Sequence, residues 1–367
     1  MTPRVEQLTV HIVPVPLVRP FVTAVRRADS IDAVLVEIVD SDGRSGWGEA
    51  AASWRVTGES PASIRAAVNG PLADVVVGCD PADAPILSAE LVRSVVHNAA
   101  ARSAVDCALY DLAAQGAGEP LSSYLGGGDA PVRTDMTISA GGTEELVRAA
   151  LEHCRNGFRS LKIKVGAGQD DTFAVLAVRE AIGAEVVLRV DANQGWDAQQ
   201  AVRIIRFWED HDVNLEFVEQ PVAAGSLDDL AAVTRRVDTP VLADESVWTT
   251  HDLNEIIARR GADMINVKLA KAGGMTEALR LVAAATANDM GVVVGCMMES
   301  HVGIASAAAL VSALAPADGA RAQDLDAGLW LRSSPVIGGV RYHHDTVLPA
   351  RGPGLGITGL VRGKLEL

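Results

Sequence analysis

Between about Val132 and Arg332, short apolar runs alternate with helical stretches at a spacing of roughly 25 residues. Eight runs of this kind occur, namely VRTDMTIS, SLKIKVG, VVLRVD, NLEFVE, PVLADE, DMINVK, GVVVGC and GARAQDLD. Repeated strand–helix units indicate parallel pairing, and eight of them close into a barrel. We therefore predict an α/β fold with a TIM-type (β/α)8 barrel over residues 131–332. A doubly wound open sheet is the rival fold, but no GxGxxG motif follows an early strand.

The first 130 residues have a different pattern. The segments VEQLTVHIVPV and DAVLVEIVDSDGRSGWGEA alternate in polarity around an SDG turn, which predicts antiparallel strands. The segments PASIRAAVNGPL and ARSAVDCALYDLAAQGAG have helical periodicity, and the second ends at Gly residues and Pro120. Residues 1–130 are thus expected to form a separate α+β domain. Residues 333–367 are rich in Gly and Pro and are expected to return to that domain.

Composition limits the partners and the compartment. The chain of 367 residues is long enough for a barrel and a smaller domain. A net charge of −15 disfavours nucleic-acid binding. The four cysteines form no CxxC pair, which favours a reducing, cytoplasmic location, and no apolar run is long enough for a membrane span.

Charged side chains follow most of the apolar runs. The active sites of this barrel lie at the C-terminal ends of its strands, and six of the eight runs end in charged residues. These residues are Lys162 and Lys164 on strand two, Asp191 on strand three, Glu219 on strand four, Asp244 on strand five, Lys268 on strand six, and Asp324 and Asp326 on strand eight. Residues two apart on a strand face the same side, so each same-strand pair points together.

The three carboxylates of Asp191, Glu219 and Asp244 lie on adjacent strands and are expected to converge. Hard oxygen ligands of this kind suit Mg²⁺. Strands two and six are opposite in a ring of eight, so Lys164 and Lys268 are expected to approach a substrate from opposite faces. Each piece alone has a plain structural explanation as a helix cap, a turn or a surface lysine. The joint pattern favours a site.

With these motifs the chain resembles the enolase superfamily, in particular its muconate lactonizing enzyme subgroup. The resemblance covers essentially the whole chain and is carried by LKIKVG, VDANQGW, FVEQP, LADES, INVKLAKAGG and GCMMES. It implies an enolase-like barrel with an N-terminal capping domain that the C-terminal tail completes. It also implies proton abstraction next to a carboxylate, with Asp191, Glu219 and Asp244 binding Mg²⁺ and Lys164 and Lys268 as the acid/base pair. Lys162 would lie against the substrate carboxylate.

Among the reactions of this subgroup, the DLD of strand eight resembles the DxD motif of dipeptide epimerases. There, Asp324 and Asp326 would hold the α-ammonium group of a dipeptide, and two desolvated acids do need a cation. The segment PFVTAVRR resembles a substrate-contacting loop, in which Arg26, or the adjacent Arg27, would meet the substrate side chain. Thr137 and Cys296 also match substrate-contacting positions.

The resulting expectation is an isomerase, a Mg²⁺-dependent dipeptide epimerase that moves a proton at the α-carbon of the C-terminal residue. L-Ala-D/L-Glu is the leading substrate. A muconate cycloisomerase, an N-acylamino acid racemase, an o-succinylbenzoate synthase and a catalytically silent ligand-binding barrel remain alternatives. The resemblance further implies a homo-oligomer.

Overall fold

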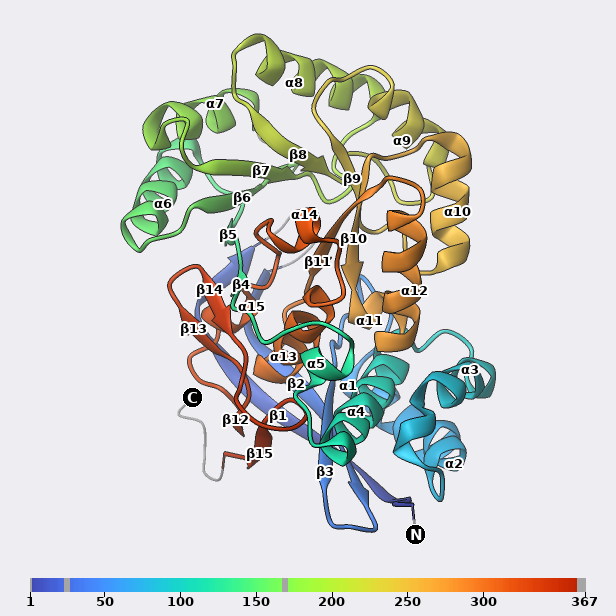
Figure 1. Cartoon of the computed structure of the whole chain (residues 1–367). Helices are drawn as coiled ribbons and strands as arrows, with labels where there is room; N and C mark the ends of the chain where they lie inside the picture. Colours follow the sequence, from blue (N-terminus) through green and yellow to red (C-terminus); the bar gives the residue numbers. More distant parts are fainter. Residues whose placement is uncertain (1, 23–26, 167–170, 362–367) are drawn as a thin grey trace.

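The computed structural model describes residues 2–22, 27–166 and 171–361. It contains an N-terminal part, called the capping part below, and a second part built on a parallel sheet, and the two meet at one face (Figure 1). The N-terminal part is a three-stranded antiparallel sheet in the order β1-β2-β3, covered by helices. Its strands are β1 (Val5–Val22), β2 (Arg27–Asp40) and β3 (Ser45–Ala50). Its helices are α1 (Pro61–Ala67), η1 (Val68–Leu72), α2 (Ala73–Val76), η2 (Pro81–Asp83), α3 (Ala84–Ser94), α4 (Ala99–Ala117) and α5 (Leu121–Tyr124).

The SDG turn lies where the sequence predicts it, between β2 and β3. Asp40 accepts hydrogen bonds from the backbone N–H groups of Asp42 and Arg44, both at 3.0 Å. Gly43 adopts a φ of +76°, a left-handed conformation that glycine tolerates at little cost. These local contacts fix the register of the hairpin.

Helix α4 lies directly on the β3 side of the capping sheet because neither surface carries bulky side chains there. A Cβ atom on Gly48 would lie 1.9 Å from the carbonyl oxygen of Ala104, and one on Gly46 would lie 2.3 Å from that of Ala108. The helix is buried on nearly all sides, which explains why the Ala-rich stretch shows little amphipathic character.

The second part is a curled parallel sheet of seven strands in the order β11-β10-β9-β8-β7-β6-β5. Its strands are β5 (Met136–Ile138), β6 (Ser160–Lys164), β7 (Val187–Asp191), β8 (Leu215–Glu219), β9 (Val241–Ala243), β10 (Met264–Lys268) and β11 (Gly291–Gly295). The parallel strand–helix repeat that the sequence predicts is therefore confirmed, with seven of the eight expected strands in one curled sheet.

The first and last of the eight apolar runs form less regular strand than the sequence predicts. The first run divides into β4 (Val132–Arg133), which pairs outside the barrel, and β5. The last run contributes only two bridging residues. Gln323 exchanges backbone hydrogen bonds with the segment before β5, and Asp324 does so with β11, so these two residues close the ring between its two edges.

Helices cover the outside of the curled sheet (Figure 1). The helices of this part are α6 (Thr143–Arg155), α7 (Asp171–Ile182), α8 (Ala198–Asp210), α9 (Leu227–Thr234), α10 (Thr250–Arg259), α11 (Leu269–Ala272), α12 (Met275–Thr286), α13 (His301–Val311), α14 (Pro316–Gly319) and α15 (Ala327–Trp330). Of these, α11, α13 and α15 contact α4, β3 and β1 of the capping part instead of lying only on the outside. Within the described ranges, no helix combines the length and the apolar character needed to cross a membrane.

The C-terminal segment contacts the capping part of the chain. It forms β12 (Val336–Gly338), β13 (Arg341–His343), β14 (Thr346–Leu348) and β15 (Ile357–Leu360). The buried carboxylate of Asp111 on α4 accepts hydrogen bonds from the N–H groups of Leu355 in this tail, at 2.7 Å, and of Trp47 in β3, at 2.8 Å. One side chain thus joins the helix, the capping sheet and the returning tail.

The contact between β3 and α4 predicts the effect of adding a single methyl group. Gly48→Ala should lower the stability of the folded chain by about 3 kcal/mol, because the new Cβ meets helix backbone that cannot rotate away. Thermal unfolding followed by circular dichroism measures the change. Gly225→Ala is the matched control, because a Cβ there meets no atom within 4 Å. Equal midpoints for the two variants would contradict the close packing.

Candidate active site

Five charged side chains form a layer, called the upper layer below, at the C-terminal ends of neighbouring strands. They are Lys164 on β6, Asp191 on β7, Glu219 on β8, Asp244 directly after β9, and Lys268 on β10. Each is buried, so each points into the barrel rather than toward solvent. Side chains two residues apart on a strand point to the same side, so the residue two positions before each of these five also points inward. That second layer consists of Lys162, Arg189, Phe217, Leu242 and Asn266.

Acids and lysines of the upper layer form ion pairs. Lys164 pairs with Asp191, and the Lys268 ammonium lies 2.6 Å from Asp244. Glu219 lies between these pairs, with its oxygens 3.9 Å from Lys268 and 3.4 Å from Lys162 of the second layer. The three predicted metal ligands and the two predicted acid/base lysines thus lie in one buried layer, and their roles stay predictions.

Because the charged side chains of this layer are buried, the pKa of each one depends on the charges of its neighbours. Desolvation and the neighbouring acids raise the pKa of Glu219 to about 7, against the opposing effect of the nearby lysines. Burial alone would raise the pKa of Asp244, but the adjacent lysines hold it well below its usual range. Burial opposes the charge of Lys268, yet Asp244 and Glu219 raise its pKa well above the usual value. A buried carboxylate in this layer therefore needs a cation beside it.

The chemistry of the side chains of Asp191, Glu219 and Asp244 suits a hard divalent cation. All three carboxylates are buried and lie on adjacent strands. Two further oxygens nearby, Oδ1 of Asn193 and Oε2 of Glu245, are buried without a hydrogen-bond partner among the described residues. Such an all-oxygen set suits Mg²⁺, which prefers carboxylates together with water and substrate oxygens.

Asp324 and Asp326 belong to a second acidic cluster, which Lys162 links to Glu219 because its ammonium contacts both Glu219 and Asp324. Together with Asp135 they offer oxygens within 4.8 Å of one another, a geometry that also accommodates a cation. Asp324 pairs with Lys162 at 2.5 Å, and Asp135 pairs with Arg189 at 2.7 Å. Asp326 instead accepts hydrogen bonds from N–H donors and has no ion pair among the described contacts. Burial and Asp324 raise the pKa of Asp326.

The remaining candidates from the sequence fall into two groups. Thr137 on β5 and Cys296 after β11 line the same cavity as the charged residues, and the Thr137 N–H donates to Asp326 at 2.8 Å. Burial and nearby acids raise the pKa of the Cys296 thiol well above its usual value, so it is a neutral wall of the cavity. Arg26 lies outside the described residues, and nothing is described of the side chain of Arg27.

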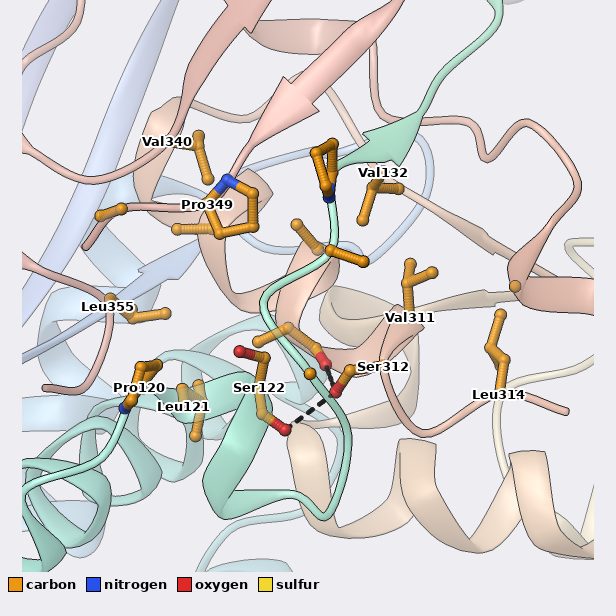
Figure 2. Close-up of a pocket in the computed structure, with 18 of the residues that line it drawn as sticks. Pro120, Leu121, Ser122, Val132, Val311, Ser312, Leu314, Val340, Pro349 and Leu355 are labelled. Carbon is orange, nitrogen blue, oxygen red and sulfur yellow. Dashed lines mark hydrogen bonds between the residues drawn. The ribbon is translucent and has the colours of Figure 1, made fainter. Parts of the chain in front are cut away.

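Residues of the upper layer and of the second acidic cluster line one cavity, called the barrel-mouth cavity below, with a volume of about 90 Å³. Met297 and Met298, which follow β11, and Val56 of the capping part form its apolar walls. Its charged lining consists of Lys162, Lys164, Lys268, Lys271, Asp244, Glu245, Asp324 and Asp326. It therefore lies between the barrel mouth and the capping part. A separate cavity of about 270 Å³ lies between α5, α13 and the tail (Figure 2). Its lining side chains include no ionisable group, so it offers no acid, base or charged ligand to a bound molecule.

Several residues of the site carry roles that the sequence reading did not assign. Asn266 donates to Glu219 at 2.8 Å, and it lies two residues before Lys268, so strand alternation could have revealed it. A Cβ on Gly295 would collide with Asn266 and Lys268, which explains the glycine at the end of β11. Lys271, three residues after Lys268, is buried and donates to Asp244.

Comparison with known families covers most of the chain. Residues 7–126 match the mandelate racemase / muconate lactonizing enzyme N-terminal domain, and residues 145–360 match the enolase C-terminal domain-like family. The L-Ala-D/L-Glu epimerase of Clostridium acetobutylicum is 38% identical over 97% of this chain and 99% of that protein. The L-Ala-D/L-Glu epimerase of Bacillus subtilis is also 38% identical, over 96% of each chain.

Solved structures agree with these sequence matches. A substrate-liganded complex of the Bacillus subtilis L-Ala-D/L-Glu epimerase aligns with a TM-score of 0.94 at 37% identity, covering 98% of this chain and 99% of that one. The dipeptide epimerase of Enterococcus faecalis, complexed with Mg and L-Leu-L-Tyr, aligns with a TM-score of 0.92 at 34% identity, covering 97% and 99%. With both domains matched and the charged layer of the barrel in place, the chain belongs to the enolase superfamily, in its muconate lactonizing enzyme subgroup.

Proposed function

We propose that this protein is a Mg²⁺-dependent dipeptide epimerase, an isomerase that transfers a proton at the α-carbon of the C-terminal residue. The single observation that carries the proposal is the placement of Lys164 and Lys268. They stand four strands apart in the ring and line the same cavity. One lysine can remove the α-proton from one face while the other returns a proton to the opposite face, which inverts the centre.

The acids between the two lysines would hold the metal ion. Asp191, Glu219 and Asp244 are the proposed ligands, because their buried oxygens form the set that fits Mg²⁺. When bound, the ion supplies Lewis-acid stabilisation of the negative charge that develops on the substrate carboxylate. Lys162 lies beside Glu219 and can add a second positive charge at the same oxygens.

The second acidic cluster selects the substrate in this proposal. Asp326 faces the cavity without a cationic partner among the described residues, and Asp324 shares one lysine with Glu219. A free α-ammonium group would supply the missing positive charge, whereas muconate or an N-acyl amino acid would not. The relative from Enterococcus faecalis, which holds Mg and a dipeptide in its crystal structure, supports the same choice.

L-Ala-D/L-Glu is the leading substrate, supported by the names of the two relatives that are 38% identical. Arg26 remains the proposed contact for the glutamate side chain, and Thr137 and Cys296 remain proposed walls of the substrate site.

We also propose a cytoplasmic location. The four cysteines, Cys79, Cys107, Cys154 and Cys296, are free thiols in the described structure, which suits a reducing compartment. A homo-oligomeric state and the absence of nucleic-acid partners stay predictions from the sequence.

A screen of L,L-dipeptides in D₂O tests the reaction itself. With Mg²⁺ present, we expect deuterium uptake and inversion at the α-carbon of the C-terminal residue, with L-Ala-L-Glu among the best substrates. EDTA should abolish the exchange and added Mg²⁺ should restore it, because the ion would supply Lewis-acid stabilisation of the charge on the substrate carboxylate. Proton NMR measures the exchange. Turnover of muconate or N-succinyl amino acids, with no exchange in any dipeptide, would refute the proposal.

Removal of either lysine should stop the inversion. Lys164→Ala and Lys268→Ala are each expected to reduce epimerisation by at least about 100-fold, the lower range for general acid–base catalysis. Polarimetry measures inversion, and NMR in D₂O measures the α-proton exchange that the remaining lysine still performs on one stereoisomer. Arg93→Ala on the surface of the capping part is the control. Near-native inversion in either lysine variant would disprove the two-base assignment.

Neutralising Asp326 should weaken dipeptide binding. Asp326→Asn keeps the acceptor oxygen for Thr137 but loses the charge that faces the ammonium group, so KM should rise about 10- to 100-fold. The inhibition constant of the N-acetylated dipeptide, which lacks the ammonium group, should change little. Steady-state kinetics measures both constants, with the exposed Asp228→Asn as control. A KM that does not rise would show that Asp326 plays no part in ammonium recognition.

A further inference from the structure

Trp330 donates a hydrogen bond to the carboxylate that we assign to ammonium recognition. Its indole Nε1 lies 3.0 Å from Oδ2 of Asp326, and the Thr137 N–H lies 2.8 Å from the same oxygen. The indole is 1% exposed, so water does not compete for this bond. Two donors on one oxygen fix the plane of the carboxylate and hence the direction of its other oxygen.

The other side of this indole faces a different cavity. Among the described residues, Trp330 is absent from the lining of the barrel-mouth cavity, but it lines a separate cavity of about 330 Å³ together with Arg19 and His153. Trp330 therefore acts on the active site through Asp326 rather than by touching the substrate.

Arg19 of the capping strand β1 supports the indole. Its guanidinium carbon lies 4.7 Å from the centroid of the Trp330 ring, within the range of a cation–π contact. The same guanidinium lies 2.9 Å from Nε2 of His153 on α6. Burial and the Arg19 charge lower the pKa of His153 to about 4, so its ring is neutral at pH 7 and accepts the hydrogen bond.

The backbone on both sides of this contact is also joined. Leu17 of β1 forms an antiparallel bridge with Leu331, and the Arg332 N–H donates to the Pro16 carbonyl oxygen at 3.0 Å. The Arg332 side chain donates to the Leu17 carbonyl oxygen at 3.2 Å. The capping strand is thus fastened to the residues that directly follow Trp330.

We propose that Trp330 is a positioning residue that orients Asp326 for the substrate ammonium group, and that Arg19 holds Trp330 in place from the capping strand. The inference rests on the proposed epimerase function. It makes the ammonium site a joint product of the barrel and the capping part, although neither Arg19 nor Trp330 contacts the dipeptide.

Trp330→Phe tests the role of the hydrogen bond. The variant keeps an aromatic ring beneath Arg19 and loses only the N–H donor and part of the indole volume. For the dipeptide that the wild-type enzyme turns over best, KM should rise about tenfold, while kcat stays within about twofold. The inhibition constant of the N-acetylated form of that dipeptide should stay within about twofold, because it brings no ammonium group to Asp326.

Trp208→Phe is the matched control. Trp208 is equally buried and its Nε1 donates to the Thr172 carbonyl oxygen at 2.9 Å, away from the barrel-mouth cavity. Loss of this donor should leave KM unchanged. In an Asp326→Asn background, Trp330→Phe should add less than about a twofold change, because the charge that it orients is already gone.

Arg19→Met provides a test that leaves Trp330 intact, and it decides the question if the Trp330→Phe variant fails to fold. It should raise the dipeptide KM about two- to threefold without changing the inhibition constant of the N-acetylated form. Equal changes in both constants for either variant, or an equal rise of KM in Trp208→Phe, would overturn the positioning role. Absence of epimerisation in the wild-type enzyme would instead refute the proposed function, so the two failures are distinguishable.

Discussion

The burial of charge at the mouth of the barrel is the constraint on which the rest of the structure depends. Two lysines flank three successive acids around the ring, so that Lys164 meets Asp191, Lys268 meets Asp244, and Glu219 lies between the pairs. A buried charge is costly unless an opposite charge or a hydrogen-bond donor compensates it. The compensation is incomplete in the acid-rich part of the ring, and this imbalance creates the demand for a metal ion and for a cationic substrate group.

The layers beneath and above this ring serve the same requirement. Below it, Asn266 satisfies Glu219 from the second layer, and Gly295 leaves room for that amide and for the Lys268 side chain. Above it, Val56 and Met298 line the cavity with apolar side chains. A buried charged layer beneath a partly apolar roof gives each ionic interaction more weight than it would have in solvent.

The capping part is tied to the barrel by contacts between segments that are far apart in the chain. Glu49 of β3 accepts hydrogen bonds from the backbone of Ser300 and Gly303 at the start of α13, and Arg19 of β1 contacts Trp330. These ties place β1 beside the segment that carries Asp326. Substrate recognition therefore depends on how the two parts of the chain are joined, as well as on the barrel itself.

The sequence by itself determined the barrel, its strand order and the five charges of the upper layer. The 25-residue rhythm and the rule that alternate strand residues share a face are local signals, and residues at consecutive strand ends must converge once the sheet curls. Only the tertiary structure decided which partner each charge has, how two residues close the eighth position of the ring, and that Trp330 orients Asp326 beneath Arg19. Such contacts join segments separated by up to some 300 residues, and periodicity and spacing carry no information at that range, because they describe only neighbours along the chain.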